Sequence, residues 1–167
     1  MSRKIAQQVA FKVKAEDCDK VTRKNKKVVY IYTDGACKGN PGPAGLGFVA
    51  IFKNSMILQY SEYIGCTTNN VAELQAIYRA LQICGQLFST QTPIVIVSDS
   101  KYALSVLNAD KIKNLKKNKH YELLWRVRGM YRAFTYHDSC HVSAHRGDKY
   151  NEVADALASD ACKFPKI

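Results

Sequence analysis

The run PIVIVS at residues 93–98 constrains the fold of this chain more than any other segment. Its apolar, β-branched side chains follow one another without alternation, which is typical of a strand covered on both faces. The sheet that contains this strand therefore needs helices to cover it. With 167 residues, 47% of them hydrophobic, the chain is long enough for one domain with a substantial core.

The patterns on either side of this run predict the order of the remaining elements. We expect strands at 28–33, 46–53, 56–65, 93–98 and 135–144, and helices at 69–86, 101–107, 121–134 and 151–162. Asn54-Ser55 is predicted to form a tight hairpin between the second and third strands. This order predicts an α/β fold with a mixed five-stranded sheet, in which the first three strands form an antiparallel meander.

The chain divides at residue 28 into a basic extension and a globular domain. Residues 1–27 lack strong patterning, although Ile5, Val9 and Val13 fall on one helical face and allow a short amphipathic helix. A transit peptide is the less favoured alternative, because acidic residues interrupt the segment. We therefore expect residues 1–27 to be a partly helical or flexible extension and residues 28–167 to be the functional domain.

The net charge of +11 is concentrated in two blocks. Residues 1–27 hold nine Lys/Arg against three Asp/Glu (+6), residues 111–132 hold eight against one (+7), and the rest sums to −2. Two basic blocks around a mildly acidic body predict a polyanionic partner. A surface that only keeps the protein in solution would have the same charge, so composition leaves both readings open.

The cysteine pattern and the hydropathy indicate the compartment. Six cysteines show no CxxC spacing and no ligand spacing with histidine, so we expect free thiols in a reducing environment and no zinc. No apolar run reaches the length of a membrane span, and no secretory signal opens the chain. We expect a monomer in the cytoplasm or another intracellular reducing compartment, neither secreted nor bound to a membrane.

Two aspartates follow strongly apolar runs. Asp34 comes after the run at 28–33, and Asp99 comes directly after PIVIVS. Two strands of one sheet that each end in aspartate can place both carboxylates side by side, where they repel each other unless a cation is bound. The alternative is that each aspartate forms a turn after its strand, as Asp-Gly and Asp-Ser commonly do.

Two further carboxylates lie next to predicted core positions. Glu73 borders the apolar face of the helix at 69–86, and Asp155 stands between two alanines in an alanine-rich helix. The alternative for Glu73 is a glutamate at the edge of the core with its carboxylate in solvent. The alternative for Asp155 is a negative charge that stabilises the first turn of its helix. Several convergent carboxylates without matching basic residues would suit a hard cation such as Mg²⁺. His145, on a glycine-containing loop ten residues before Asp155, is a candidate proton carrier or else an exposed bystander.

Four blocks of the sequence together resemble the signature blocks of type 1 ribonuclease H. They are YTDGACKGNPGPAG, TTNNVAELQAIYRAL, VSDSKYAL and HRGDKYNEVADALA, in the order and spacing of that family, and the resemblance spans residues 28–163. It implies the ribonuclease H-like fold and an endoribonuclease that cuts the RNA strand of RNA–DNA hybrids.

The resemblance also implies the catalytic residues and the cofactor. It places a carboxylate tetrad on Asp34, Glu73, Asp99 and Asp155 and the mobile-loop histidine on His145. Two Mg²⁺ ions are expected, one held by Asp34 and Asp155 and the other by Asp34, Glu73 and Asp99, with Mn²⁺ as a possible substitute. Hydrolysis would leave 5′-phosphate and 3′-hydroxyl ends.

Substrate contacts are implied in the same way. Asn40, Asn69 and Asn70 match residues that hold the minor groove near the 2′-hydroxyls, and Thr68 matches a residue that helps seat a phosphate of the DNA strand. These residues could instead form turns and helix caps. The remaining candidates are basic: Lys101 stands where many members have glutamine, and Lys113, Lys116 and Lys117 belong to a short basic segment without tryptophan.

Three other functions fit parts of the pattern. A hybrid-binding module without activity would lack one of the carboxylates, and all four are present. A resolvase or integrase of the same general fold would lack GNPGPAG and TTNN. A phosphate-loop nucleotidase would need GxxxxGK[ST], which the sequence does not contain.

Overall fold

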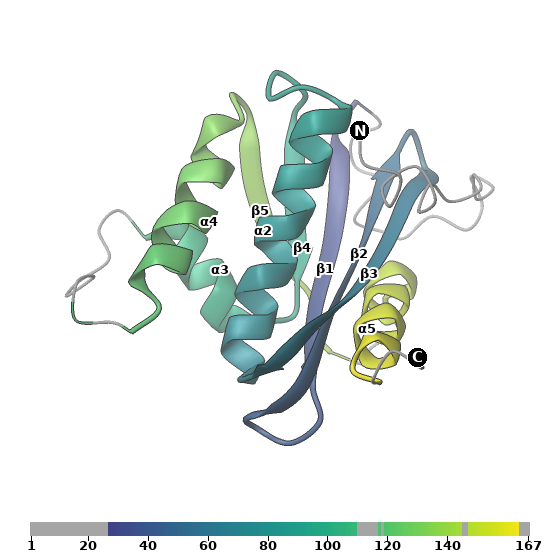
Figure 1. Ribbon diagram of the computed structural model, residues 1–167. Helices are drawn as coiled ribbons and strands as arrows, with labels where there is room; N and C mark the ends of the chain where they lie inside the picture. Colours follow the sequence, from purple (N-terminus) through teal and green to yellow (C-terminus); the bar gives the residue numbers. More distant parts are fainter. Residues whose placement is uncertain (1–26, 110–116, 118, 145–146, 164–167) are drawn as a thin grey trace.

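A computed structural model of the chain describes residues 27–109, 117, 119–144 and 147–163 (Figure 1). The short amphipathic helix predicted in the amino-terminal extension lies outside these residues. The described part forms one five-stranded sheet with helices packed on both of its faces.

The sheet has the strand order β3-β2-β1-β4-β5. Its strands are β1 (Val29–Cys37), β2 (Gly42–Phe52), β3 (Ser55–Thr67), β4 (Ile94–Ser98) and β5 (His137–His141). β1 pairs antiparallel with β2, and β2 with β3, whereas β4 runs parallel to both β1 and β5. The predicted mixed sheet with an antiparallel meander is therefore confirmed, and β1 is its central strand.

Helices cover both faces of the sheet (Figure 1). α2 (Asn69–Leu87), α3 (Lys101–Asn108) and α4 (Tyr121–Ala133) lie on one face, and α5 (Lys149–Ala161) lies on the other. Side chains such as Ile31, Leu81 and Ile96 fill the larger core under α2, while Tyr32 and Tyr150 pack in the smaller core under α5. None of the helices in the described ranges is long and apolar enough to span a lipid bilayer.

The first hairpin is longer than the sequence predicts. β1 continues for three residues beyond Asp34, which pairs with Gly47 inside the ladder, and β2 already begins at Gly42. The expectation that Asp34 follows the end of a strand is wrong, and so is the alternative that it begins a turn. Glycine and proline disfavour strands, but here the small residues continue the hairpin because helices approach it closely.

Two glycines on the hairpin permit this close approach from opposite faces. A Cβ atom on Gly35 would overlap the backbone of Ala72 and Glu73 in α2. A Cβ atom on Gly47 would stand 2.6 Å from the Cβ of Leu157 and 2.7 Å from the amide nitrogen of Ala158 in α5. The segment around Asp34 is therefore held between two helices, one on each side of the sheet.

The carboxy-terminal elements also differ in length from their predictions. β5 spans five residues instead of ten. α5 begins at Lys149, two residues earlier than expected, because the Asp148 side chain accepts a hydrogen bond from the amide of Asn151 and caps the helix.

Candidate active site

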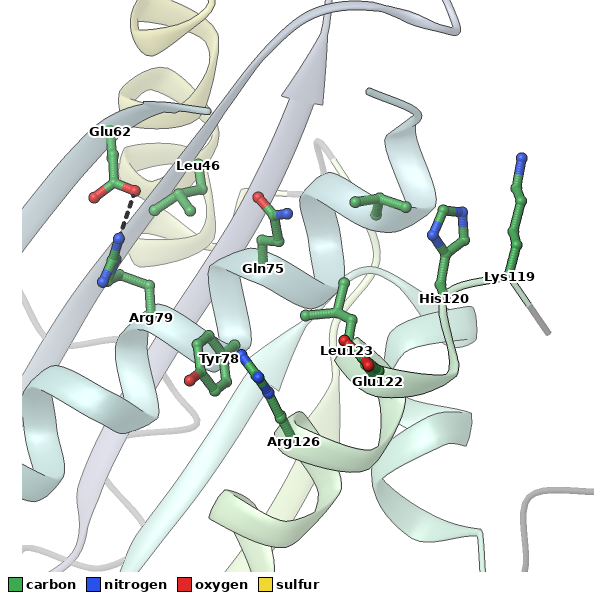
Figure 2. Close-up of a pocket in the computed structure, with 11 residues that line it drawn as sticks. Leu46, Glu62, Gln75, Tyr78, Arg79, Lys119, His120, Glu122, Leu123 and Arg126 are labelled. Carbon is green, nitrogen blue, oxygen red and sulfur yellow. Dashed lines mark hydrogen bonds and ion pairs between the residues drawn. The ribbon is translucent and has the colours of Figure 1, made fainter. Parts of the chain in front are cut away.

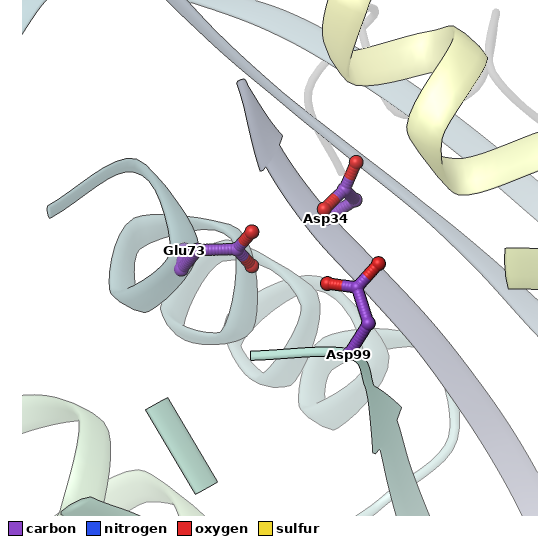
Figure 3. Close-up of side chains that lie close together, drawn as sticks. All are labelled: Asp34, Glu73 and Asp99. Atoms are coloured by element: carbon purple, nitrogen blue, oxygen red, sulfur yellow. The ribbon is translucent and has the colours of Figure 1, made fainter. Parts of the chain in front are cut away.

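Three carboxylates meet beside the central strand (Figure 3). Asp34 comes from β1, Glu73 from the second turn of α2, and Asp99 from the residue after β4; one oxygen of each lies within 4.8 Å of the others. The parallel pairing of β1 and β4 brings the two aspartates together, and the contact of α2 with Gly35 brings Glu73 to them. Residues distant in sequence thus form one acidic cluster.

The cluster is strained electrostatically in the absence of a cation. Asp34 is 5% exposed, and burial, followed by repulsion from Glu73, raises the pKa of its carboxyl far above the usual value. Burial also raises the pKa of Glu73, with a further contribution from Asp99, although hydrogen bonds from Asp34 and from the amide of Gly35 oppose this. Keeping all three groups ionised therefore requires compensating positive charge.

Asp155 reaches the same cluster from the opposite layer of the fold. It is half-buried on α5, and its carboxyl is close enough to form a hydrogen bond with that of Asp34 and to repel Glu73. It is not one of the three groups within 4.8 Å of one another. The four carboxylates predicted from the sequence therefore converge: Asp34, Glu73 and Asp99 form the tight group, and Asp155 lies beside Asp34.

Asn151 is a member of this site that the sequence did not reveal. Its side chain is 2% exposed, and its Nδ2 atom donates a hydrogen bond to Oδ2 of Asp99 at 3.3 Å. Asn151 lies one helical turn before Asp155, so both side chains face the sheet from α5. The signal that could have found it is this four-residue spacing on the predicted inward face.

The residues present suit a divalent metal ion with oxygen ligands. The cluster offers only carboxylate oxygens, which are the preferred ligands of Mg²⁺ and Mn²⁺. Oε2 of Glu73 is buried and has no hydrogen-bond partner among the residues that the structure describes. A bound cation would satisfy this oxygen and offset the repulsion.

A polar hollow of about 550 Å³ lies beside the amino-terminal end of α2. Oδ1 of Asn40 accepts a hydrogen bond from the amide of Asn69 at 3.1 Å, which joins the first hairpin to the helix. Thr68 caps α2 by accepting a hydrogen bond from the amide of Val71 at 3.3 Å. The residues that line the hollow are Asn40, Thr68, Asn69, Asn70, Tyr102, Lys119 and His120. The four predicted contact residues thus share one surface with Tyr102, Lys119 and His120.

Of the predicted basic contacts, the structure describes Lys101 and Lys117. Lys101 is exposed at the first position of α3 and lines a separate hollow of about 430 Å³, together with His141 of β5. Lys117 is exposed. The remaining candidates, Lys113, Lys116 and His145, lie outside the described residues.

A third hollow, of about 450 Å³, runs over the outer side of α2 towards α4 and contains none of the clustered carboxylates (Figure 2). At one end Arg79 forms an ion pair with Glu62 at 2.9 Å, and Tyr60 donates a hydrogen bond to the same carboxylate at 2.6 Å. At the other end it is lined by Lys119 and His120, which also line the hollow beside Asn69. The two hollows therefore adjoin.

Comparison with known proteins assigns the family. The family model for RNase H matches residues 25–163, which include the whole sheet and all four clustered carboxylates. The chain belongs to the ribonuclease H family. The predicted family, fold and enzyme class are thereby confirmed.

Several ribonucleases H match the chain over most of their own length. It is 37% identical over 146 residues to a ribonuclease H of Wolbachia pipientis wMel, a match that covers 82% of this chain and 97% of the relative. The structure of RNase H1 from the archaeon Halobacterium salinarum superimposes with a TM-score of 0.69 at 30% identity, covering 80% of this chain and 96% of that one. LC11-RNase H1, solved in complex with an RNA/DNA hybrid, superimposes with a TM-score of 0.67 at 28% identity, covering 80% and 96%.

Proposed function

We propose that the chain hydrolyses the RNA strand of RNA–DNA hybrids and leaves 5′-phosphate and 3′-hydroxyl ends. The observation that carries this proposal is the carboxylate cluster around the buried Asp34. Its member Glu73 lies one helical turn from Asn69 and Asn70, which line a polar hollow. Membership of the ribonuclease H family and similarity to a relative bound to a hybrid support it.

The carboxylates are proposed to hold two divalent ions. Asp34 and Asp155 would bind one Mg²⁺, and Asp34, Glu73 and Asp99 would bind the second, with Mn²⁺ as a substitute because it accepts the same oxygen ligands. Bound Mg²⁺ would supply Lewis-acid activation of water and stabilisation of charge on the leaving oxygen. The amide group of Asn151 fixes the orientation of Asp99, and the backbone of Gly35 does the same for Glu73.

The asparagine-lined hollow is proposed to select the sugar. Amide side chains both donate and accept hydrogen bonds, so Asn40, Asn69 and Asn70 can pair with a 2′-hydroxyl, which has the same dual capacity. The bond between Asn40 and the amide of Asn69 holds two of these residues at a fixed separation. Thr68 would contribute its hydroxyl to a phosphate of the DNA strand.

The remaining sequence-based assignments stay proposals. Residues 28–167 would form the catalytic domain and residues 1–27 a basic extension. Lys101, Lys113, Lys116 and Lys117 would contact phosphates, and His145 would carry a proton at the site. One copy suffices for this function, because all four carboxylates come from a single chain.

The deciding experiment compares end-labelled RNA–DNA hybrid, double-stranded RNA and double-stranded DNA, each with and without Mg²⁺. We expect cleavage of the hybrid alone, only with the metal, and only in the RNA strand. A run of ribonucleotides inserted into one strand of duplex DNA should restore cutting within that run. Efficient cleavage of plain duplex DNA would favour the resolvase alternative and refute the proposal.

The matched variants are Asp34→Asn and Asp160→Asn. The first removes a charge from the centre of the cluster and should abolish cleavage. The second removes an exposed carboxylate of α5, whose partner is Lys163 at 3.2 Å, and should leave the rate unchanged. Activity of Asp34→Asn within tenfold of the parent would contradict its assignment as a metal ligand.

A further inference from the structure

The α4 helix presents two large aromatic side chains to solvent. Tyr121 is 42% exposed and Trp125 is 63% exposed, although exposure of their large apolar ring surfaces to water is unfavourable. They stand four residues apart and therefore lie one above the other on the same side of the helix. The core is contacted by other positions of α4, namely Leu124, Val127 and Tyr131. Packing within the described residues thus does not account for the two exposed rings.

Two arginines continue the same side of α4. Arg128 and Arg132 follow Trp125 by three and seven residues, which keeps them on the side of Tyr121 and Trp125. Nε of Arg128 and Nη2 of Arg132 both donate to the carbonyl oxygen of Ala109 at the end of α3, at 2.8 and 3.0 Å. These two bonds hold both guanidinium groups beside the end of α3.

The surroundings of these rings are strongly positive. Among the described residues of 117–132, five are Lys or Arg and only Glu122 is acidic, a net charge of +4. The five basic residues are Lys117, Lys119, Arg126, Arg128 and Arg132. Aromatic side chains surrounded by basic residues are typical of sites that bind single-stranded nucleic acid without sequence preference, because bases stack on the rings and phosphates bind the basic groups.

We propose that the face formed by Tyr121, Trp125, Arg128 and Arg132, here called the α4 aromatic face, binds single-stranded nucleic acid. The strand must be unpaired at this point, because the faces of bases inside a duplex are covered by their stacked neighbours. Trp125 stacks with one base, Tyr121 extends the platform, and the arginines contact the flanking phosphates. Nothing in the proposed hybrid cleavage requires this face.

The position of the face indicates which single strand it meets. Lys119 and His120 line the hollow that also contains Asn69 and Asn70. Trp125 is five residues further along α4, a rise of about 7.5 Å from His120. Successive nucleotides of one strand are about 3.4 Å apart, so a strand that leaves a hybrid seated at that hollow can reach Trp125 within about two nucleotides. The occupant is the unpaired continuation of a hybrid, and this last step rests on the proposed function.

The chain contains its own reporter for this contact, because Trp125 is its only tryptophan. Tryptophan fluorescence should be titrated in EDTA, where no cleavage occurs, with a short single strand, a blunt hybrid, and the same hybrid with a single-stranded tail. We expect quenching by the single strand and by the tailed hybrid and little change with the blunt hybrid. Quenching by all three to the same extent, or by none, would overturn the proposal.

Affinity measurements separate stacking from charge. The readout is the ratio of the dissociation constants of blunt and tailed hybrid, obtained by fluorescence anisotropy of labelled nucleic acid. We expect the tail to tighten binding about tenfold in the parent and in Trp125→Phe, and to add almost nothing in Trp125→Ala. The matched control is Tyr136→Ala, which removes an equally exposed aromatic residue (65%) beside β5 and should keep the ratio of the parent.

The outcomes distinguish this inference from the proposed function. A tail effect that persists in Trp125→Ala would show that charge alone holds the strand and would refute stacking. If the blunt hybrid is cut with Mg²⁺ but the tail adds no affinity, only the present inference fails, and the exposed rings are then better explained by a protein partner. If no hybrid is cut but single strands still quench Trp125, the α4 aromatic face stands and the proposed function fails.

Discussion

A single methyl group at Gly35 should damage both the stability and the activity of the protein. Gly35 follows Asp34 in β1, and a Cβ atom there would overlap the backbone of Ala72 and Glu73 in α2. Gly35 is not among the glycines with positive φ, so Gly35→Ala tests steric overlap and not backbone strain. Because the overlapping atoms are backbone atoms of a regular helix, they cannot rotate away, and β1 and α2 must separate.

The size of the effect follows from this overlap. Overfilling a packed site costs about 1–3 kcal/mol, and the rigid partners place Gly35→Ala at the upper end, about 2–3 kcal/mol. For a chain of this size we expect the melting temperature to fall by about 5–10 °C. The separation also moves Asp34 away from Glu73, and a displacement near 1 Å at a reacting centre costs about 10²-fold in rate.

The assay combines urea unfolding with cleavage of a labelled hybrid. The control is Gly129→Ala, because Gly129 is exposed in the middle of α4 and a Cβ atom there meets no described atom within 4 Å apart from the backbone of its own helix. That variant should gain about 0.5–1 kcal/mol from helix propensity and keep its activity. Equal unfolding free energies for Gly35→Ala and the parent would refute the argument that glycine is needed for the approach of α2.

Three further predictions concern charge. In EDTA, Asp34→Asn should raise the free energy of unfolding. Burial and neighbouring carboxylates raise the pKa of Asp34 in the folded protein, so the parent loses stability as the pH rises above 3.8. The stability advantage of the variant over the parent should therefore increase with pH. His145→Ala should lower the cleavage rate by about 10²-fold at most with nearly unchanged affinity, and a loss as complete as that of Asp34→Asn would make it a primary catalytic group. Replacing Lys113, Lys116 and Lys117 by glutamine should flatten the slope of log affinity against log salt by about 2 to 3, and an unchanged slope would show that these lysines only solubilise their segment.

The sheet was predictable because each strand signal in the sequence is local. A continuous apolar run such as PIVIVS and alternating runs around Asn54-Ser55 identify strands without knowledge of the rest of the fold. The position of Asp99 after β4 follows from the same signal. The convergence of Asp99 with Asp34 then needs only that the two strands be parallel neighbours, which they are.

The extent of the first hairpin could not be predicted, because its cause lies in the packing of distant segments. Glycine at 35 and 45 reads locally as a loop, and only the helices on both sides of the sheet show why small residues belong in these strands. The bond between Asn151 and Asp99 joins residues 52 positions apart.

The origin of Asp155 in α5 bears on how the protein is made. Asp34, Glu73 and Asp99 all belong to the first hundred residues, whereas Asp155 is added by the last described helix, which also covers Gly47. A chain still growing on the ribosome lacks the fourth carboxylate until α5 has been synthesised and has packed. If all four carboxylates are needed to bind the metal ions, nascent chains and chains truncated before α5 are inactive. Cleavage of RNA then begins only after synthesis of the domain is essentially complete.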